Sequence, residues 1–194
     1  MNTNTLERDI LVKDDTRRWV QRAVIGLNLC PFAKSVEVKG QVRYAVSHAA
    51  RAKALLVDLE RELLQLVATD PAALDTTLLI APDGFSDFLE FNDLLARADQ
   101  LLVDLDFDGV LQIASLHPKY QFADTEPEDI TNYTNRAPYP TLHLLREESV
   151  DRAVAAFPNP EAIFETNMQT MRRLGVGGWN ALNVVARADD ESQS

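Results

Sequence analysis

Residues 77–116 have the sequence TLLIAPDGFSDFLEFNDLLARADQLLVDLDFDGVLQIASL, and they predict a strand, a helix and a second strand in succession. The first segment, residues 77–81, is a short apolar run typical of a fully buried strand. Asp87 and Glu90 then form a capping-box-like pair, with aspartate in the usual serine or threonine place, ahead of an apolar stripe with helical spacing. The second strand, residues 110–116, follows an aspartate-rich turn. A helical crossover between two strands favours parallel, right-handed pairing.

The flanking segments extend this pattern on both sides. A strand is predicted at residues 42–46, where apolar residues alternate with polar or small ones. A long helix capped by Ser47 and ended by Asp70-Pro71 follows it. A fourth strand, residues 141–145, comes after a long loop without a helix, so we expect it to lie antiparallel to the third. The predicted fold is α/β: a small mixed sheet of about four strands, mostly parallel with one antiparallel strand, covered by helices in a single layered domain.

Further helices are expected near both ends of the chain. The first runs from about Thr16 to Asn28 and is stopped by Pro31. Another runs from about Ser149 to Ala156. The last helix carries an apolar stripe and ends at Gly175, the first glycine of a GVGG segment. Because that segment follows a helix and not a strand, it predicts a helix stop and hinge and not a dinucleotide fingerprint.

Composition limits the classes of function. The 194 residues fit one globular domain, residues 1–194, with frayed tails expected at 1–14 and 187–194. The chain has 19 basic and 30 acidic residues, a formal charge of −11, and a field of that sign disfavours nucleic acid and anionic membranes as partners. The N-terminus lacks the apolar segment of a secretory signal, and a single cysteine cannot form an internal disulfide. We therefore expect a cytoplasmic protein.

The loop between the last two predicted strands carries the densest polar chemistry. Residues 117–147, HPKYQFADTEPEDITNYTNRAPYPTLHLLRE, contain two of the three histidines and three of the four tyrosines. Most connections in compact domains are about 4–6 residues long, and a much longer one is usually a functional lid or binding loop. This loop is accordingly the predicted site.

The predicted site places two histidines at one end of the sheet. If the third and fourth strands pair antiparallel, His117 at the end of one lies near His143 at the start of the other. Histidine titrates near neutral pH and suits acid–base catalysis, and arginine binds carboxylate or phosphate. We expect the catalytic pair His117 and His143, with a small anionic metabolite held by Arg136, Asn132, Asn135 and Tyr120.

Other interpretations of the same residues stay open. The histidines could be buried residues hydrogen-bonded to backbone, with the polar loop residues only holding its shape. They could instead bind a metal with Asp124 or Asp129, although no HExxH or CxxC spacing supports a metal site. The loop could also dock a partner without catalysis. The sequence leaves reaction and cofactor unknown.

Two smaller motifs have structural interpretations. Cys30, at the end of the first predicted helix, is expected to be a buried structural thiol, because a helix C-terminus disfavours the thiolate. Residues 104–109, DLDFDG, resemble the start of a calcium loop, but the twelfth position is Ser115 and not glutamate. A helix-ending turn is the simpler interpretation.

Three stretches resemble one known family. They are LNLCPFA (residues 27–33), HPKYQFADTEPEDITNYTNRAPYPTLHLLREESV (117–150) and GVGGWN (175–180). The chain is similar over nearly its whole length to the bacterial and plant proteins grouped as domain of unknown function fourteen-fifteen. The resemblance implies a single soluble domain. It brings no established activity and no catalytic role for any position.

Overall fold

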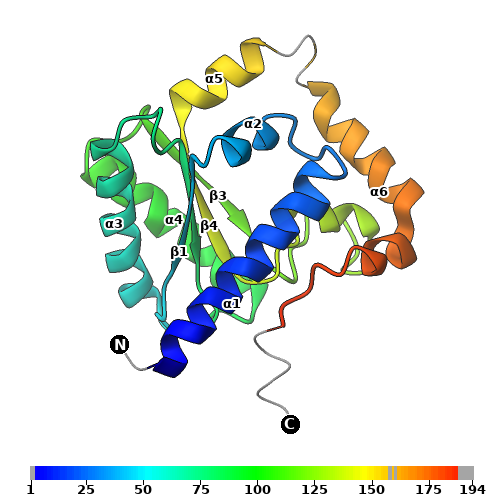
Figure 1. Ribbon diagram of the computed structural model, residues 1–194, viewed down its shortest axis with the longest axis horizontal. Coiled ribbons are helices and arrows are strands. Elements are labelled where there is room, and N and C mark those ends of the chain that lie inside the picture. The colour runs from blue at the N-terminus through cyan, green and yellow to red at the C-terminus, as the bar shows by residue number, and fades with distance from the viewer. Residues whose placement is uncertain (1–2, 157–158, 160, 188–194) are drawn as a thin grey trace.

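The computed structural model describes residues 3–156, 159 and 161–187, and shows one open sheet with helices on both faces (Figure 1). The strands are β1 (Val42–Val46), β2 (Thr76–Ile80), β3 (Leu111–Leu116) and β4 (Thr141–Arg146). All four lie within a residue of their predicted positions. The predicted α/β class and the mixed sheet are confirmed.

The order of the strands is β1-β2-β4-β3. β1 and β2 pair in parallel, and β4 pairs antiparallel with both β2 and β3. The first three strands therefore share one direction and β4 opposes them, as predicted. However, β4 lies between β2 and β3, so only one of the three pairings is parallel and the sheet is not mostly parallel by pairing. The chain reaches this central place through the long loop, which no sequence pattern specified.

Two helices cover one face of the sheet, α3 (Ala52–Ala68) and α4 (Phe88–Asp104). α4 begins as predicted, because the Asp87 carboxylate accepts a hydrogen bond of 3.0 Å from the backbone N–H of Glu90. α3 begins later than predicted, at Ala52, and Ser47 does not cap it. The Ser47 hydroxyl instead donates to the carboxylate of Asp58 on the same helix.

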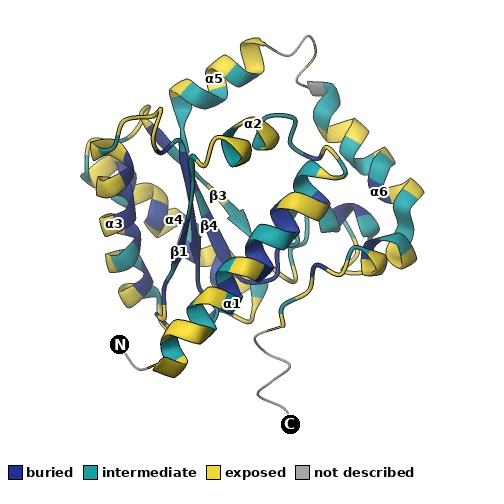
Figure 2. Cartoon of the chain, in the orientation of Figure 1, coloured by how far each residue is buried: buried dark blue, intermediate teal, exposed yellow. Residues whose placement is uncertain are grey.

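The other face packs against α1 (Thr3–Trp19), the π-helical segment η1 (Val20–Ile25) and α6 (Glu161–Ala181) (Figure 1). α1 begins at Thr3, so residues 3–14 are helical and the frayed tail expected there is wrong. Residues 188–194, in the other expected tail, lie outside the described residues. In Figure 2 the buried residues form an inner stripe on α3 and line the strands, while exposed residues cover the outer helix surfaces.

Three short helices complete the fold: α2 (Ala33–Val38), the 3-10 helix η2 (Ile130–Asn135) and α5 (Glu147–Ala155). Inside α6, Gly175 has φ 63° and ψ 174°, a conformation open essentially only to glycine, so it breaks the helix where a stop was predicted. Among the helices that the structure describes, none has both the length and the apolar character needed to cross a bilayer.

Candidate functional site

The register of β3 and β4 separates the two predicted catalytic histidines. Ala114 pairs with His143, and Leu116 pairs with Thr141. Directly paired residues point to the same face of a sheet, and side chains alternate along a strand. His143 therefore shares a face with Ala114. His117, three positions beyond Ala114, continues the opposite face, so the predicted His117–His143 pocket is wrong.

His117 is fully buried on the α4 side of the sheet. Its ring lies 5.5 Å, centroid to centroid, from both Phe88 and Phe91. The Nε2 atom lies 2.8 Å from the carbonyl oxygen of Phe85, and Nδ1 lies 3.0 Å from the backbone nitrogen of Lys119. Since a backbone N–H can only donate, Nδ1 accepts and Nε2 carries the proton. Burial lowers the pKa of His117, and with both nitrogens occupied this neutral ring has a structural position.

Asn132 holds the loop together from inside. Its side-chain oxygen accepts hydrogen bonds of 2.9 Å from the Phe122 backbone N–H and from the Thr125 hydroxyl. Its amide donates to the Glu126 carbonyl at 2.8 Å. The side chain is fully buried, so these contacts fix the loop's shape and leave little of it for a ligand.

Asn135 and Tyr120 also make contacts that shape the loop. The carbonyl of Asn135 accepts a 3.2 Å hydrogen bond from the His117 backbone N–H. The Tyr120 ring packs against Phe88 and Phe122, with centroids 5.1 and 5.0 Å away. The structure thus brings the predicted substrate-binding residues into one loop, where their recorded contacts are with the protein itself.

Arg136 retains unused hydrogen-bonding capacity. Its Nε donates to the Tyr120 carbonyl at 3.2 Å, its Nη2 donates to the Pro127 carbonyl at 2.6 Å, and its guanidinium carbon lies 4.2 Å from the Tyr133 ring centroid. None of the carboxylates within the described part of the chain pairs with it. Nη1 has no partner there either, so this half-buried side chain keeps a net positive charge and free donors.

His143 is the predicted site residue that the structure leaves most available. It lies half-buried on β4 between Leu78 of β2 and Ala114 of β3, and Ala114 is exposed. No hydrogen bond, ion pair or ring contact to any described residue involves its imidazole. Burial lowers the pKa of His143 to about 4, so the ring is neutral at pH 7 and offers one donor and one acceptor.

The third histidine, His48, was missing from the predicted site. It lies two residues after the end of β1, and Asp83 lies three residues after the end of the parallel neighbour β2. The His48 ring contacts Asp83 and also Asp9 of α1. Ligand sites in open α/β sheets favour the carboxyl ends of strands. That rule, applied to the two predicted parallel strands, would have identified the His48–Asp83 pair.

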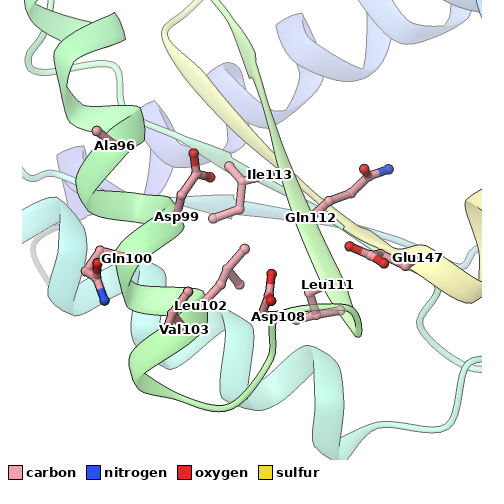
Figure 3. Close-up of a pocket in the computed structure, with 10 residues that line it drawn as sticks. All are labelled: Ala96, Asp99, Gln100, Leu102, Val103, Asp108, Leu111, Gln112, Ile113 and Glu147. Atoms are coloured by element: carbon pink, nitrogen blue, oxygen red, sulfur yellow. The ribbon is translucent and has the colours of Figure 1, made fainter.

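Two surface cavities lie away from the predicted catalytic and substrate-binding residues. One, of about 410 Å³, lies between α4 and β3 and has the carboxylates of Asp99, Asp108 and Glu147 in its wall (Figure 3). The other, of about 630 Å³, lies between α2, α5 and the turn before β2. Neither is lined by His117, by His143 or by the predicted substrate-binding residues.

The geometry gives no support to a metal centre. Within the described ranges, no three side chains of His, Cys, Asp or Glu are grouped where they could hold a metal ion. Asp129 uses one carboxylate oxygen to accept from the backbone N–H and the hydroxyl of Thr131, both at 2.8 Å.

Cys30 is a free thiol, half-buried where full burial was expected.

The sequence model of the family described as "Protein of unknown function (DUF1415)" matches residues 11–181. The chain belongs to this family. The match spans all four strands and both helical layers, and it confirms the family resemblance drawn from the three motifs. No curated protein and no solved structure matches the chain. Membership of DUF1415 therefore brings no activity with it, and any function must be argued from the geometry.

Proposed function

We propose that the protein is a cytoplasmic enzyme that binds a small anionic metabolite on the sheet face around His143, with His143 as its acid–base group. One observation carries the proposal: this half-buried imidazole has no partner within the described residues. Buried polar side chains in proteins are in their large majority hydrogen-bonded. An imidazole left without a protein partner is available to a ligand or to water.

The neighbouring residues on β3 leave space beside His143 and add a polar side chain next to it. Ala114, directly opposite His143, has only a methyl side chain and is exposed. Gln112 pairs with Leu145, so it is a diagonal neighbour of His143 on the same face. Figure 3 shows Gln112 and Ile113 on opposite sides of β3, with Ile113 toward α4. The amide of Gln112 can donate and accept, which suits a polar ligand.

A bound anion would change the protonation state of His143. A neutral imidazole with a pKa of about 4 is a weak base, but a negative charge brought beside it favours the protonated form and raises that pKa. Binding would then convert His143 from a neutral acceptor into a proton donor at near-neutral pH. Nucleic acid remains an unexpected partner for a chain with a formal charge of −11.

Arg136 is the proposed second contact to the anion. Its free Nη1 donors and its lack of a carboxylate partner among the described residues support this role. It belongs to the loop that joins β3 to β4, the strands that carry Gln112 and His143. Asn132, Asn135 and Tyr120 contribute indirectly in this proposal, because they hold the loop that presents Arg136.

The test uses the fact that the chain has only three histidines, which side-chain NMR can resolve. Inorganic phosphate and succinate are titrated into the full chain while the imidazole ¹⁵N signals are followed. We expect the His143 signals to move and the pKa of His143 to rise, with a smaller change at His117, whose two ring nitrogens are occupied by backbone partners and which senses the site through the charge of Arg136. In His143→Gln the affinity for the anion should fall by about tenfold or more, the loss of about 1.4 kcal/mol of binding free energy.

Two variants make the result specific. His48→Gln removes a histidine that takes no part in the proposed site, and it should leave the affinity unchanged. Arg136→Lys keeps the charge but loses the planar fork, and it should weaken binding while the chain stays folded. Anion titrations that move no His143 signal, or that move only His48, would refute the proposal.

A further inference from the structure

His48 lies between two carboxylates that come from different parts of the fold. Its Nε2 is 2.8 Å from Oδ1 of Asp9 on α1, and its Nδ1 is 2.6 Å from Oδ2 of Asp83 in the turn after β2. Arg8 of α1 forms an ion pair with the same Asp83. The charged groups that meet at His48 are therefore two from α1 and one from the β2–α4 turn.

This geometry requires a protonated ring. An ionised carboxylate has only acceptors, so each ring nitrogen that faces one must donate, and only the imidazolium carries a proton on both nitrogens. A neutral ring would turn one lone pair toward a carboxylate oxygen. In agreement, the hydrogen bond that the ring donates to Asp83 raises the pKa of His48, burial opposes it, and the hydrogen bond donated to Asp9 raises the pKa further.

The part of α1 that these contacts hold has little apolar attachment of its own. The first buried residue of the helix is Val12, and every residue before it in the helix is exposed or half-buried. Of the three large apolar side chains in these turns, Leu6 and Ile10 are 51% and 52% exposed and Leu11 is half-buried. Beyond Leu11, the attachment of residues 3–11 to the sheet thus depends on Arg8, Asp9 and their partners.

We infer that His48 is a proton-controlled latch that holds the first turns of α1 against the carboxyl ends of β1 and β2. When His48 carries its second proton, it bridges Asp9 and Asp83 and the turns are closed. Loss of that proton leaves one of the two contacts repulsive, and the turns open more readily because the other contact and the Arg8–Asp83 ion pair alone then hold them. The opened state uncovers the ends of two parallel strands, a position that α/β proteins use for ligands. The latch does not depend on the proposed role of His143.

Hydrogen exchange of the full chain against pH tests the latch directly. After correction for intrinsic rates, protection of amides in residues 7–11, the first with acceptors inside the helix, should fall by up to about tenfold for each pH unit between the ordinary histidine pKa and the raised one. It should stay low above that range. Amides of β2 should keep their protection throughout. His48→Gln should give low protection of residues 7–11 at every pH.

Asp14→Asn is the matched control for Asp9→Asn. Both variants remove one negative charge from α1, but Asp14 pairs with Arg17 and not with His48. Asp14→Asn should keep the pH-dependent step. NMR of the wild-type chain and of Asp9→Asn adds a second measurement, in which the His48 pKa should be lower in the variant. A step that survives in His48→Gln, no step in the wild type, or equal pKa values in wild type and Asp9→Asn would each overturn the latch.

Discussion

The three histidines of this chain occupy three different chemical environments. His117 has both ring nitrogens occupied by backbone partners, His48 has both facing carboxylates, and His143 has no partner among the described residues. The sequence grouped His117 with His143 because they flank one loop. Their partners depend on strand register and on segments distant in sequence. As a result, His117 is a structural residue, His48 is held between charged groups, and the imidazole of His143 is available to a ligand.

At the residue scale, Arg146 makes a strong prediction about stability. Its guanidinium donates to the carbonyls of Leu66, Thr69 and Leu74, and so satisfies the end of α3 from the strand β4. Arg146→Met should destabilise the protein by about 2 kcal/mol, because these carbonyls lose their donors in a part-buried position. Urea unfolding followed by circular dichroism measures the change.

The same substitution at Arg152 provides the control. Arg152 forms an exposed ion pair with Glu148, with side chains 59% and 77% exposed, so Arg152→Met should change stability by no more than about 0.5 kcal/mol. Equal effects of the two substitutions would show that Arg146 does not cap α3.

At the scale of elements, local patterns predicted the strands well and the helix starts unevenly. The alternation in β1 and the apolar run in β2 are local signals of burial, and both strands were found where predicted. Asp87 caps α4 because its partner, Glu90, is close in sequence. Ser47 was expected to act in the same way but bonds to Asp58, a tertiary contact that no local pattern indicates. The early turns of α1 were not predicted because they lack an apolar stripe.

The register between β3 and β4 is what the sequence could not predict about the candidate site. Period-two alternation assigned His117 and His143 to faces within their own strands, but it could not say which residues are paired across the two strands. An odd offset between Ala114, the partner of His143, and His117 put the rings on opposite faces. A shift of one position would have joined them.

The break in α6 gives a prediction at this scale. Gly175→Ala should destabilise the protein by about 1–3 kcal/mol, because φ 63° with ψ 174° is accessible essentially only to glycine. An added Cβ meets no atom within 4 Å, so the cost comes from the backbone alone. Gly177→Ala, two residues on in helical conformation with equally open space, should instead stabilise by up to about 1 kcal/mol. Thermal unfolding of both variants measures the contrast, and effects of the same sign would contradict the assigned backbone.

For the whole molecule, the lowered pKa of His143 predicts how stability depends on pH. The unfolded chain takes up a proton at His143 near pH 6.5, whereas the folded chain does so only near pH 4. The unfolded state therefore binds more protons between these values, and stability falls as the pH drops through this window. His117, whose pKa is also lowered, acts in the same direction. His48, with a raised pKa, acts in the opposite direction above pH 6.5.

The prediction is measured by urea unfolding at pH 7 and pH 5. His143→Gln removes one proton-binding group, so its loss of unfolding free energy between these two pH values should be smaller than the wild type's by about 2 kcal/mol. Titration of the many surface carboxylates affects both proteins alike and cancels in the comparison. Identical losses in the two proteins would mean that the pKa of His143 is not lowered by folding.

The central place of β4 has a consequence for the order in which the protein is made and folded. β3 has β4 as its sole neighbour in the described sheet, and β2 needs β4 on the side away from β1. A ribosome delivers β4 last of the four strands, so until residue 146 has emerged β3 has nothing to pair with. Until then the apolar residues of β2 and β3 belong to a sheet that lacks its β4 strand. Pairings across such long sequence separations close slowly, because the entropy of the intervening chain is lost before the contacts form. We therefore expect the sheet of the DUF1415 domain to be completed late in synthesis, when the last strand inserts between β2 and β3.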